Sequence, residues 1–403
     1  MYERIQKPGD FSDLACKGQS FSRANRRIQN ESKFAPGKYQ NGGGKALPTS
    51  LNSRFPFFNA VLTLAQAVIT EIQPESDSSP REVLESAVSL VAGEMTRVDE
   101  VIQSRLTSDI ALINSLSAYI INSGGKRLRP VTLLLCARAL DCEHDHAVLL
   151  AAVIEFIHTA TLLHDDVVDA SEMRRGNATA NAVWGNEASV LVGDFLYSRA
   201  FEMMVESGRM AVMEVMAETT NRIAEGEVLQ LLNAHEPETS ETQYLETITR
   251  KTAKLFESAG KLAAIVAGAD QTVTDGLANY GLHLGIAFQI VDDLLDFAED
   301  ADSMGKNQGD DLAEGKPTLP LIYALANANE QDAETIRTAI TNGERERFEE
   351  IAKIVESTGA LAYTSRRARE EAEKAKSALA CLPESRYRQA LIDLADFSVA
   401  RTF

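Results

Sequence analysis

Apolar residues recur at intervals of three and four positions through nearly all of the chain beyond position 80. Because an α-helix turns once every ~3.6 residues, this spacing places them on one helical face. One such stripe contains Val153, Phe156, Ile157 and Ala160. Proline, which interrupts helices, occurs only once between residues 131 and 316. The pattern therefore predicts an all-α protein built from long helices.

A second stripe, through Ile286, Gln289 and Ile290, has the same period. The sequence contains neither a Gly-x-Gly-x-x-Gly motif nor a phosphate-binding Walker loop, and no alternating apolar pattern that would form a parallel sheet. These observations argue against the common nucleotide-binding α/β folds. The chain has 403 residues, of which 44% are hydrophobic, so it can bury one large core or two ordinary ones.

Two aspartate triplets with the same spacing follow these stripes, and each is surrounded by apolar sequence. They are Asp165, Asp166 and Asp169, and Asp292, Asp293 and Asp296. On a helix the first and third members of a triplet share a face, and the second points about 100° to one side. Carboxylates so close together repel one another unless they share a cation. A solvated acidic face is the ordinary alternative, but the apolar residues before each triplet argue against it.

Magnesium is the cation that suits such a cluster. It prefers oxygen ligands and is usually held by one or two carboxylates together with substrate phosphates. Two triplets on facing helices would therefore hold Mg²⁺ ions with a diphosphate clamped between them. A third acidic segment, Asp310 to Glu314, has similar spacing but is bracketed by Gly309 and Gly315. We expect this third segment to be a loop.

Basic residues occur at four places that could meet such a diphosphate. Two glycines precede the first group, and glycine allows a close approach of the backbone to an anion. The groups are Lys126, Arg127 and Arg129, then Arg174 and Arg175, then Lys251 and Lys254, and finally Lys306 and Lys316. A single Lys or Arg would be ordinary surface charge. Four groups arranged around two aspartate triplets instead favour a metal–diphosphate site.

The first 55 residues differ in composition from the rest. They contain ten Lys or Arg and four Asp or Glu, a net of +6, which leaves −25 for the other 348 residues because the whole chain carries −19. Abundant Gly, Ser and Asn without periodicity are typical of disorder. We interpret residues 1–79 as a disordered basic extension and residues 80–403 as the folded domain. An organelle-targeting peptide, a mis-assigned start codon and a dispensable extension all fit the N-terminal part.

Together these motifs resemble those of the trans-polyprenyl diphosphate synthases, a family of all-helical isoprenoid prenyltransferases. The resemblance covers roughly residues 80–403 and leaves 1–79 outside. The matching motifs are GGKRLRP at 124–130, LLHDDVVDASEMRRG at 162–176, GDFL at 193–196, EGE at 225–227, KTAKLF at 251–256, FQIVDDLLDF at 288–297 and GKNQGDDLAEGKPTLPL at 305–321. The resemblance implies a single large helical bundle of the isoprenoid synthase type with a central active-site cavity.

The resemblance also implies roles for individual residues. The diphosphate of isopentenyl diphosphate would be bound by Lys126, Arg129, His158 and Arg175. The allylic diphosphate would be contacted by Arg174, Lys251, Thr252, Gln289, Lys306 and Lys316. A cluster of about three Mg²⁺ ions per active site would be held by Asp165, Asp169 and Asp292, with Asp166, Asp293 and Asp296 assisting. The six aspartates, Arg174 and Lys251 would form the catalytic set.

The implied reaction is ionisation of the allylic diphosphate, assisted by metal ions and basic residues, followed by attack of the isopentenyl double bond on the carbocation. The growing chain would extend between helices, and Ala160 and Thr161, one turn before the first triplet, would form its floor. Family members that stop early tend to carry a bulky aromatic residue there. These small residues predict an octaprenyl to decaprenyl product for a ubiquinone side chain, similar to that of the bacterial long-chain synthases. Close helix packing is an equally good explanation for Ala160.

Two other functions share some of these features. A terpene cyclase or a short-chain farnesyl or geranylgeranyl synthase also ionises an allylic diphosphate, although GGKRLRP argues against a cyclase, which holds no second diphosphate. A non-catalytic subunit of a heteromeric synthase would keep the fold, but such subunits typically lose aspartates, and all six are present here.

The composition and the resemblance also predict the setting of the protein. Net negative charge argues against nucleic acid as a partner. The family suggests a homodimer, and the apolar product suggests peripheral membrane association. The four scattered cysteines fit reducing surroundings, which indicates a bacterial cytoplasm. The location would be mitochondrial if the extension is a targeting peptide.

Overall fold

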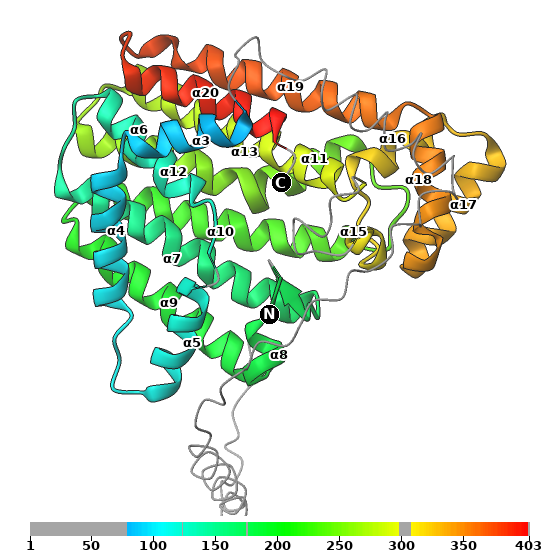
Figure 1. Cartoon of the computed structure of the whole chain (residues 1–403), viewed down its shortest axis with the longest axis horizontal. Helices are drawn as coiled ribbons and strands as arrows, with labels where there is room; N and C mark the ends of the chain where they lie inside the picture. The colour runs from blue at the N-terminus through cyan, green and yellow to red at the C-terminus, as the bar shows by residue number, and fades with distance from the viewer. Residues whose placement is uncertain (1–78, 123, 175, 298–307, 402–403) are drawn as a thin grey trace, which may run out of the picture. The chain divides into compact units, whose positions relative to one another are not determined.

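The computed structural model describes residues 79–122, 124–174, 176–297 and 308–401, which lie in one compact unit. Helices dominate this unit, so the predicted all-α fold is confirmed (Figure 1). The N-terminal half contains α3 (Pro80–Ser89), α4 (Ala92–Arg105), α5 (Ala111–Asn122), α6 (Leu128–Ala139), α7 (Asp145–Val168), α8 (Ala180–Trp184), α9 (Asn186–Glu206) and α10 (Met210–Asn233). The C-terminal half contains α11 (Glu241–Ile248), the π-helix η1 (Thr249–Ala253), α12 (Lys254–Ala267), α13 (Gln271–Leu295), α15 (Asp310–Ala313), α16 (Leu319–Asn327), α17 (Glu330–Asn342), η2 (Arg345–Arg347), α18 (Phe348–Ser357), α19 (Ala360–Ala378), η3 (Leu379–Cys381) and α20 (Arg386–Ala400).

Local capping residues set where several helices begin. The first described helix, α3, starts in a capping box, because Ser79 Oγ accepts from the backbone N–H of Glu82 and the Glu82 carboxylate accepts from the backbone N–H of Ser79. Asp270 caps α13 by accepting from the backbone N–H of Val273 at 2.9 Å. These side chains satisfy N–H groups that have no partner within the helix.

The two triplet-bearing helices, α7 and α13, end within the triplets themselves. Helix α7 ends at Val168 with Asp169 as its C-cap, and α13 ends at Leu295 with Asp296 as its C-cap. Each triplet therefore occupies the last turn of a long helix.

Helix α12 holds α7 and α13 in place. It packs against α13, α10, α6 and α7, while α19 packs along α13 and α9 packs along α7 (Figure 1). A Cβ at Gly260 would lie 2.0 Å from the Leu277 carbonyl oxygen, and one at Gly281 would lie 2.1 Å from the Phe256 carbonyl oxygen. Only glycine permits this close approach of α12 and α13. Although α7 is long and apolar enough to cross a membrane, most of it is buried, so it is a core helix of the bundle.

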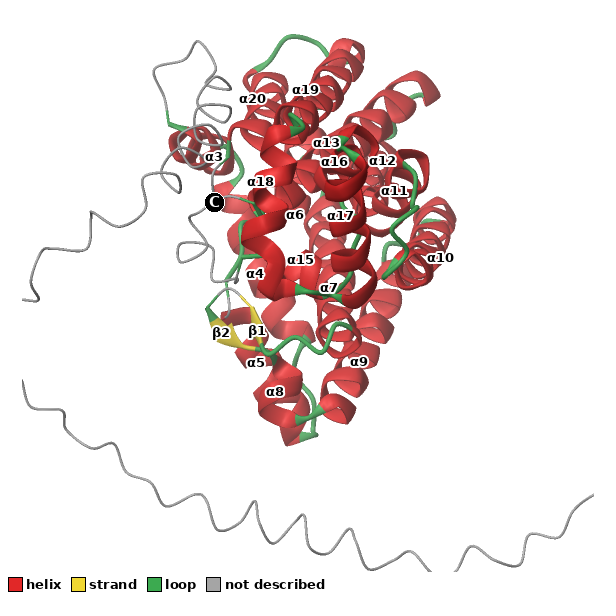
Figure 2. Ribbon diagram, turned by 90° about the vertical axis from the view of Figure 1, so that its right-hand side faces the viewer, coloured by secondary structure: helices red, strands yellow, loops and turns green. Residues whose placement is uncertain are grey.

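Two short features depart from the predicted pattern. Strands β1 (Met173–Arg174) and β2 (Asn177–Ala178) form an antiparallel hairpin beside α5 and α8 (Figure 2). Two-residue strands are too short to give an alternating signal in the sequence. The prediction that Asp310 to Glu314 is a loop was wrong, because α15 forms one helical turn there. The proposed extension of residues 1–79 lies almost wholly outside the described residues, and its character stays a prediction.

Candidate active site

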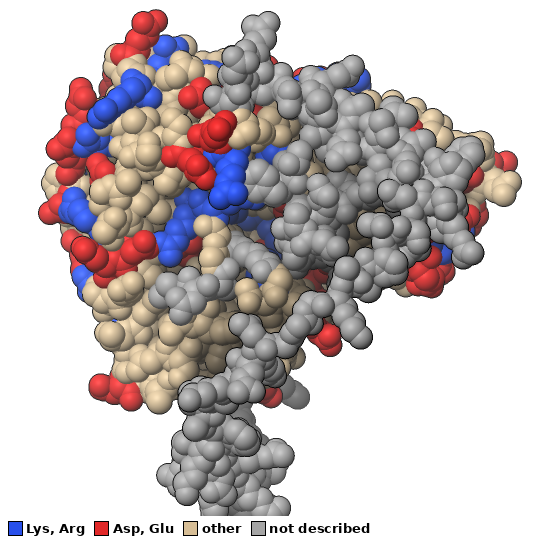
Figure 3. All heavy atoms as spheres, in the orientation of Figure 1, with Lys and Arg blue, Asp and Glu red and all other residues tan. Residues whose placement is uncertain are grey.

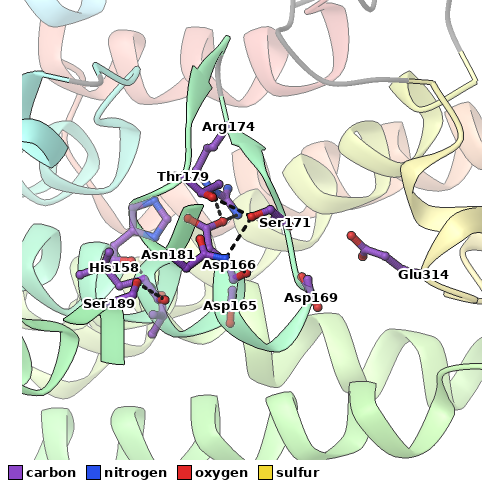
Figure 4. A network of polar contacts seen from close by, with 12 residues as sticks. His158, Asp165, Asp166, Asp169, Ser171, Arg174, Thr179, Asn181, Ser189 and Glu314 are labelled. Carbon is purple, nitrogen blue, oxygen red and sulfur yellow. Dashed lines mark hydrogen bonds and ion pairs between the residues drawn. The ribbon is translucent and has the colours of Figure 1, made fainter. Parts of the chain in front are cut away.

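The carboxylates of the first triplet point in two directions at the end of α7 (Figure 4). Asp165 and Asp169 are one helical turn apart and half-buried. Asp166 is buried and accepts from Arg174 Nε, in strand β1, at 2.7 Å. Burial raises the pKa of Asp166 above its usual value, although the charge of Arg174 opposes the rise. Asp166 thus lies to one side of Asp165 and Asp169, as the helical spacing implies, and bonds Arg174 there.

The position of both triplets at helix C-termini makes them attractive to cations. The C-terminal end of a helix carries a partial negative charge, which disfavours a nearby carboxylate by about 0.3–1 kcal/mol. Carboxylates that repel one another and also face the helix dipole need positive partners. The structure supplies a different cation for four of them, namely Asp165, Asp166, Asp169 and Asp292.

Lys251 is shared between the first triplet and helix α10. Its Nζ lies 3.4 Å from Asp165 Oδ2 and 2.6 Å from Glu227 Oε2. Burial raises the pKa of Glu227 to about 7, Asp165 adds to the rise, and Lys251 opposes it. The lysine thus occupies the place between two carboxylates that a divalent cation could take.

Lys316 has the corresponding place beside Asp169. Its Nζ donates to Asp169 Oδ2 at 3.2 Å and also contacts the Glu314 carboxylate. Burial alone would lower the pKa of Lys316, but Glu314, Asp169 and Asp311 together raise it. The segment that follows α15 therefore brings a cation to the first triplet.

The second triplet has partners of a different kind. Asp292 Oδ1 accepts from Arg401 at 3.1 Å. Asp293 is buried, and its two oxygens accept from the Tyr244 hydroxyl at 2.6 Å and from Gln289 Nε2 at 2.8 Å. Burial is the main reason that the pKa of Asp293 rises to about 8. Neutral donors thus contact Asp293, while an arginine faces Asp292.

The π-helix η1 connects the two triplets. Lys251 contacts Asp165 of the first triplet, and the next residue, Thr252, donates from Oγ1 to Gln289 Oε1 at 3.0 Å. Gln289 in turn donates to Asp293 of the second triplet. A π-turn widens the helix, and such turns are frequent at functional sites. Here the π-turn lets Lys251 contact helix α7 and the next residue, Thr252, contact helix α13.

A close backbone approach keeps η1 in this position. Gly226 in α10 faces the backbone of Lys251, and a Cβ there would lie 2.5 Å from the Lys251 backbone nitrogen. Because Gly226 precedes Glu227, the same turn of α10 both approaches η1 and supplies the carboxylate that holds the Lys251 side chain.

The donor set suits a hard cation, although no preformed cage is present. Within the described residues, no three acidic, imidazole or thiol side chains converge as metal ligands would. Asp165, Asp169 and Asp292 each face an internal cation instead. A site that offers only a few protein ligands, all of them oxygen atoms, fits Mg²⁺. This ion keeps several waters and takes its remaining ligands from substrate phosphates. The residues present therefore fit a metal that arrives together with a diphosphate.

The residues expected to bind the second diphosphate lie partly together. Arg129 donates from an η nitrogen to His158 Nε2 at 3.1 Å, and its guanidinium stands 4.5 Å from the centre of the Phe256 ring. Lys126 is half-buried in the segment before α6. Figure 3 shows Lys and Arg side chains gathered near the centre of this face of the molecule. Arg175, also expected to bind this diphosphate, lies outside the described residues, as does Lys306, which is expected to contact the allylic diphosphate.

A cavity lies beside the first triplet, on the Asp166 side of α7. His158, Asp166 and Arg174 form polar parts of its wall, and its apolar wall comes from Ile102, Leu106, Ile120, Phe156, Leu162, Leu163 and Leu196. Ala160 is fully buried and Thr161 half-buried, and neither lines this cavity. Their role as the floor of a product channel stays a prediction.

Several residues of this site were missed in the sequence. Glu227, Tyr244, Asp311 and Arg401 all contact or polarise the triplets. Glu227 lay in the EGE motif and Asp311 in the segment expected to be a loop, so both had a sequence signal. Tyr244 and Arg401 had none, because nothing near them in the sequence differs from ordinary amphipathic helix.

Comparison with known proteins identifies the family. The family model described as polyprenyl synthetase matches residues 110–358, which is more than half of the chain. The chain belongs to the polyprenyl synthetase family. Octaprenyl diphosphate synthase of Escherichia coli is 52% identical over 319 residues, covering 79% of this chain and 99% of that protein. The geranyl-diphosphate-specific all-trans-nonaprenyl-diphosphate synthase of Rhodobacter capsulatus is 48% identical and covers 77% and 96%.

A solved structure supports the same assignment. The polyprenyl synthase of Caulobacter crescentus, complexed with calcium and isoprenyl diphosphate, superposes with a TM-score of 0.78 at 45% identity, covering 82% of this chain and 100% of that one. The polyprenyl synthetase described here is thus a prenyltransferase of the long-chain trans-polyprenyl diphosphate synthase type, as the motifs indicated.

Proposed function

We propose that this polyprenyl synthetase performs the Mg²⁺-dependent, successive condensation of isopentenyl diphosphate onto an allylic diphosphate. The observation that carries the proposal is the bridge through η1, where Lys251 lies 3.4 Å from Asp165 and Thr252 bonds Gln289 at 3.0 Å. This bridge connects both aspartate triplets through two side chains that we expect to bind phosphate.

The ion pairs of the site suggest how the diphosphate would be received. Lys251 and Lys316 each sit between two carboxylates, so they can turn to phosphate oxygens while the aspartates turn to metal ions. When bound, Mg²⁺ would neutralise the charge that develops on the leaving diphosphate. Arg174, which already bonds Asp166, would add a further positive charge to the same side.

The second substrate would bind across the site from these lysines. Arg129 and His158, already in contact, would hold the diphosphate of isopentenyl diphosphate. The double bond would then attack the allylic cation, and the proton lost would pass to the released diphosphate. Apolar walls such as Phe156, Leu162 and Leu163 would keep water from the cation.

We propose an octaprenyl to decaprenyl product, used for quinone side chains. The names of the two relatives described above support this range. Ala160 supports it as well, because its small side chain leaves room next to the first triplet if the chain passes there.

The direct test is to assay the purified chain alone with Mg²⁺, farnesyl diphosphate and isopentenyl diphosphate. Chromatography of the dephosphorylated products should give the long-chain range. Products that stop at farnesyl or geranylgeranyl length would favour a short-chain synthase. No turnover without a partner protein would favour a non-catalytic subunit.

We propose that the protein is a homodimer, and an exposed apolar face on α9 and α10 supports this. Its large side chains are Leu191, Val205, Val228, Leu231 and Leu232, of which Leu232 is 68% exposed. Exposed apolar patches often mark interfaces, and these side chains are candidates for one. Sedimentation should give a dimer for the wild-type protein and a monomer after Leu231→Glu with Leu232→Glu. A monomeric wild-type protein would contradict the proposal.

We further propose peripheral membrane association in a reducing cytoplasm. Helix α5 contains no charged residue, and Ile110 and Leu112 at its start are exposed. Figure 3 shows few charged side chains over α5 and α8. Because a polyprenyl product is apolar, its release into lipid would be easier if this uncharged surface lay against the membrane. Vesicle flotation after turnover should recover the protein with the lipid, and cell fractionation would distinguish a cytoplasmic from a mitochondrial location.

A further inference from the structure

Arg401 reaches from the end of α20 into the second triplet. One η nitrogen donates to Asp292 Oδ1 at 3.1 Å, and the other donates to the Phe288 carbonyl oxygen at 2.6 Å. The guanidinium also lies 3.7 Å from the centre of the Phe288 ring. Arg401 is only 2% exposed, so its charge is enclosed by the protein.

This arginine differs from the lysines of the same site. Lys251 and Lys316 each contact two carboxylates and keep about a fifth of their side-chain surface exposed, at 18% and 19%. Within the described residues, the hydrogen-bond and ring partners of the Arg401 side chain come from α13, and one of them is a neutral carbonyl. Its buried Nε finds no acceptor within the part of the chain that the structure describes. The lysines can exchange partners with an incoming anion, whereas Arg401 is fixed.

A fixed positive charge beside a metal-binding carboxylate has a clear electrostatic effect. It stabilises the ionised Asp292 and repels any second cation that approaches the same carboxylate. A buried guanidinium also requires a counter-charge, which Asp292 provides. The repulsion is offset only when further negative charge, such as a diphosphate, enters the site.

We propose that Arg401 is a positioning residue that acts as a built-in cation for the second triplet. It holds Asp292 in place and keeps the affinity of this triplet for a divalent cation low until a diphosphate is present. Metal and diphosphate then bind together, and the empty enzyme does not fill with metal. The inference rests on the proposed function only for the nature of the ion and of the anion.

Binding of Mn²⁺ to the metal-free protein tests this without any turnover. Free Mn²⁺ is measured by electron paramagnetic resonance, first without and then with inorganic pyrophosphate. Arg401→Met removes the charge but keeps a long side chain over Phe288, and it should bind Mn²⁺ about tenfold or more tightly than wild type in the absence of pyrophosphate. With pyrophosphate present the difference should shrink.

Two control variants separate charge from packing. Arg401→Lys keeps the charge and should bind Mn²⁺ as wild type does. Arg388→Met removes another half-buried arginine from α20, one that donates to the Leu379 carbonyl, and it should leave Mn²⁺ affinity unchanged. Unchanged or weaker Mn²⁺ binding by Arg401→Met would overturn the proposal, because it would mean that Arg401 only supports the fold.

A second measurement applies even if Arg401→Met is poorly folded. In metal-free buffer Asp292→Asn should lower the unfolding temperature, because it leaves the Arg401 charge unpaired. The double variant Asp292→Asn with Arg401→Met should recover part of that loss, and no recovery would overturn the ion pair as described. Absence of Mn²⁺ binding to wild type even with pyrophosphate would count against the proposed function instead.

Discussion

The two aspartate triplets have the same spacing and the same place at the end of a long helix, yet their surroundings differ. Asp165 and Asp169 of the first triplet face lysines that each serve a second carboxylate. Asp292 of the second faces a buried arginine, and Asp293 faces a tyrosine hydroxyl and a glutamine amide. One sequence motif thus gives an exchangeable half and a fixed half of the same site.

The residues one helical turn before each triplet also differ, in the size of their side chains. Thr161 lies four positions before Asp165, while Phe288 lies four positions before Asp292 and under the Arg401 guanidinium. The smaller side chain leaves the carboxylates of the first triplet more freedom to move. The Phe288 ring instead packs against the arginine that pairs with the second triplet. We therefore expect the first triplet to rearrange when substrate binds and the second to keep its position. The following predictions test that division.

The largest effect is expected from removing one carboxylate from each triplet. The double variant Asp165→Asn with Asp292→Asn should lower kcat by about 10³-fold or more, because charge on the leaving diphosphate is no longer neutralised. Steady-state assays with radiolabelled isopentenyl diphosphate would measure this. Full turnover by the double variant would contradict the proposed site.

Replacing one aspartate at a time should affect the stability of the protein differently for the two triplets. Asp292→Asn leaves the buried Arg401 without its counter-charge and should lower the free energy of unfolding by about 3 kcal/mol. Asp165→Asn removes repulsion at a helix C-terminus and leaves Lys251 with Glu227, so its stability should change by less than about 0.5 kcal/mol. Urea unfolding in metal-free buffer would measure both. Equal losses would remove the distinction between a fixed and an exchangeable half.

A substitution in the neighbouring helix α10 should displace η1, which bridges the two triplets. In Gly226→Ala the new Cβ would lie 2.5 Å from the Lys251 backbone nitrogen, so η1 must shift. We expect kcat to fall by about 10- to 100-fold, since a displacement of about 1 Å can have such an effect. Gly93→Ala, where a Cβ meets nothing within 4 Å, is the matched control and should retain wild-type kcat.

Enlarging the residue before the first triplet should shorten the product. Ala160→Phe adds an aromatic ring about one turn before the first triplet, and overpacking at this buried position should also lower stability by about 1–3 kcal/mol. Chromatography of dephosphorylated products would reveal the new length distribution. Ala326→Phe, at an exposed position of α16, should leave the distribution unchanged. An unaltered distribution in Ala160→Phe would leave close packing as the reason for the alanine.

The smallest effect concerns the pH dependence of stability. Burial raises the folded-state pKa of Asp293 to about 8, from 3.8 in an unfolded chain. Between about pH 4 and 8 the folded protein therefore holds a proton that the unfolded chain has released, and the free energy of unfolding should fall as pH rises. Asp293→Asn should flatten this slope in metal-free buffer. An unaltered slope would mean that Asp293 is ionised in the folded protein.

Much of the fold could be read from periodicity. The three- and four-residue spacing correctly predicted long helices, and the triplet spacing implied that Asp166 lies to one side of Asp165 and Asp169. The β1–β2 hairpin and α15 were not predicted, because elements of two to four residues have no period to detect.

The site was predictable only in part. Lys251, Thr252 and Gln289 were named from motifs, and the structure brings them together through η1. Arg401 could not be named, because it lies 109 residues from Asp292 in the chain and its own segment carries no unusual pattern. Which charge neutralises which carboxylate depends on helix packing rather than on sequence spacing.

The amino-acid sequence by itself determined the helices, the faces they bury and the two acidic clusters, since these follow from residue order within one or two helical turns. The tertiary structure decided which cation meets each carboxylate and therefore which cluster can exchange partners. Charge interactions act across distances in space, and only the packing of α10, η1, α13 and α20 sets those distances.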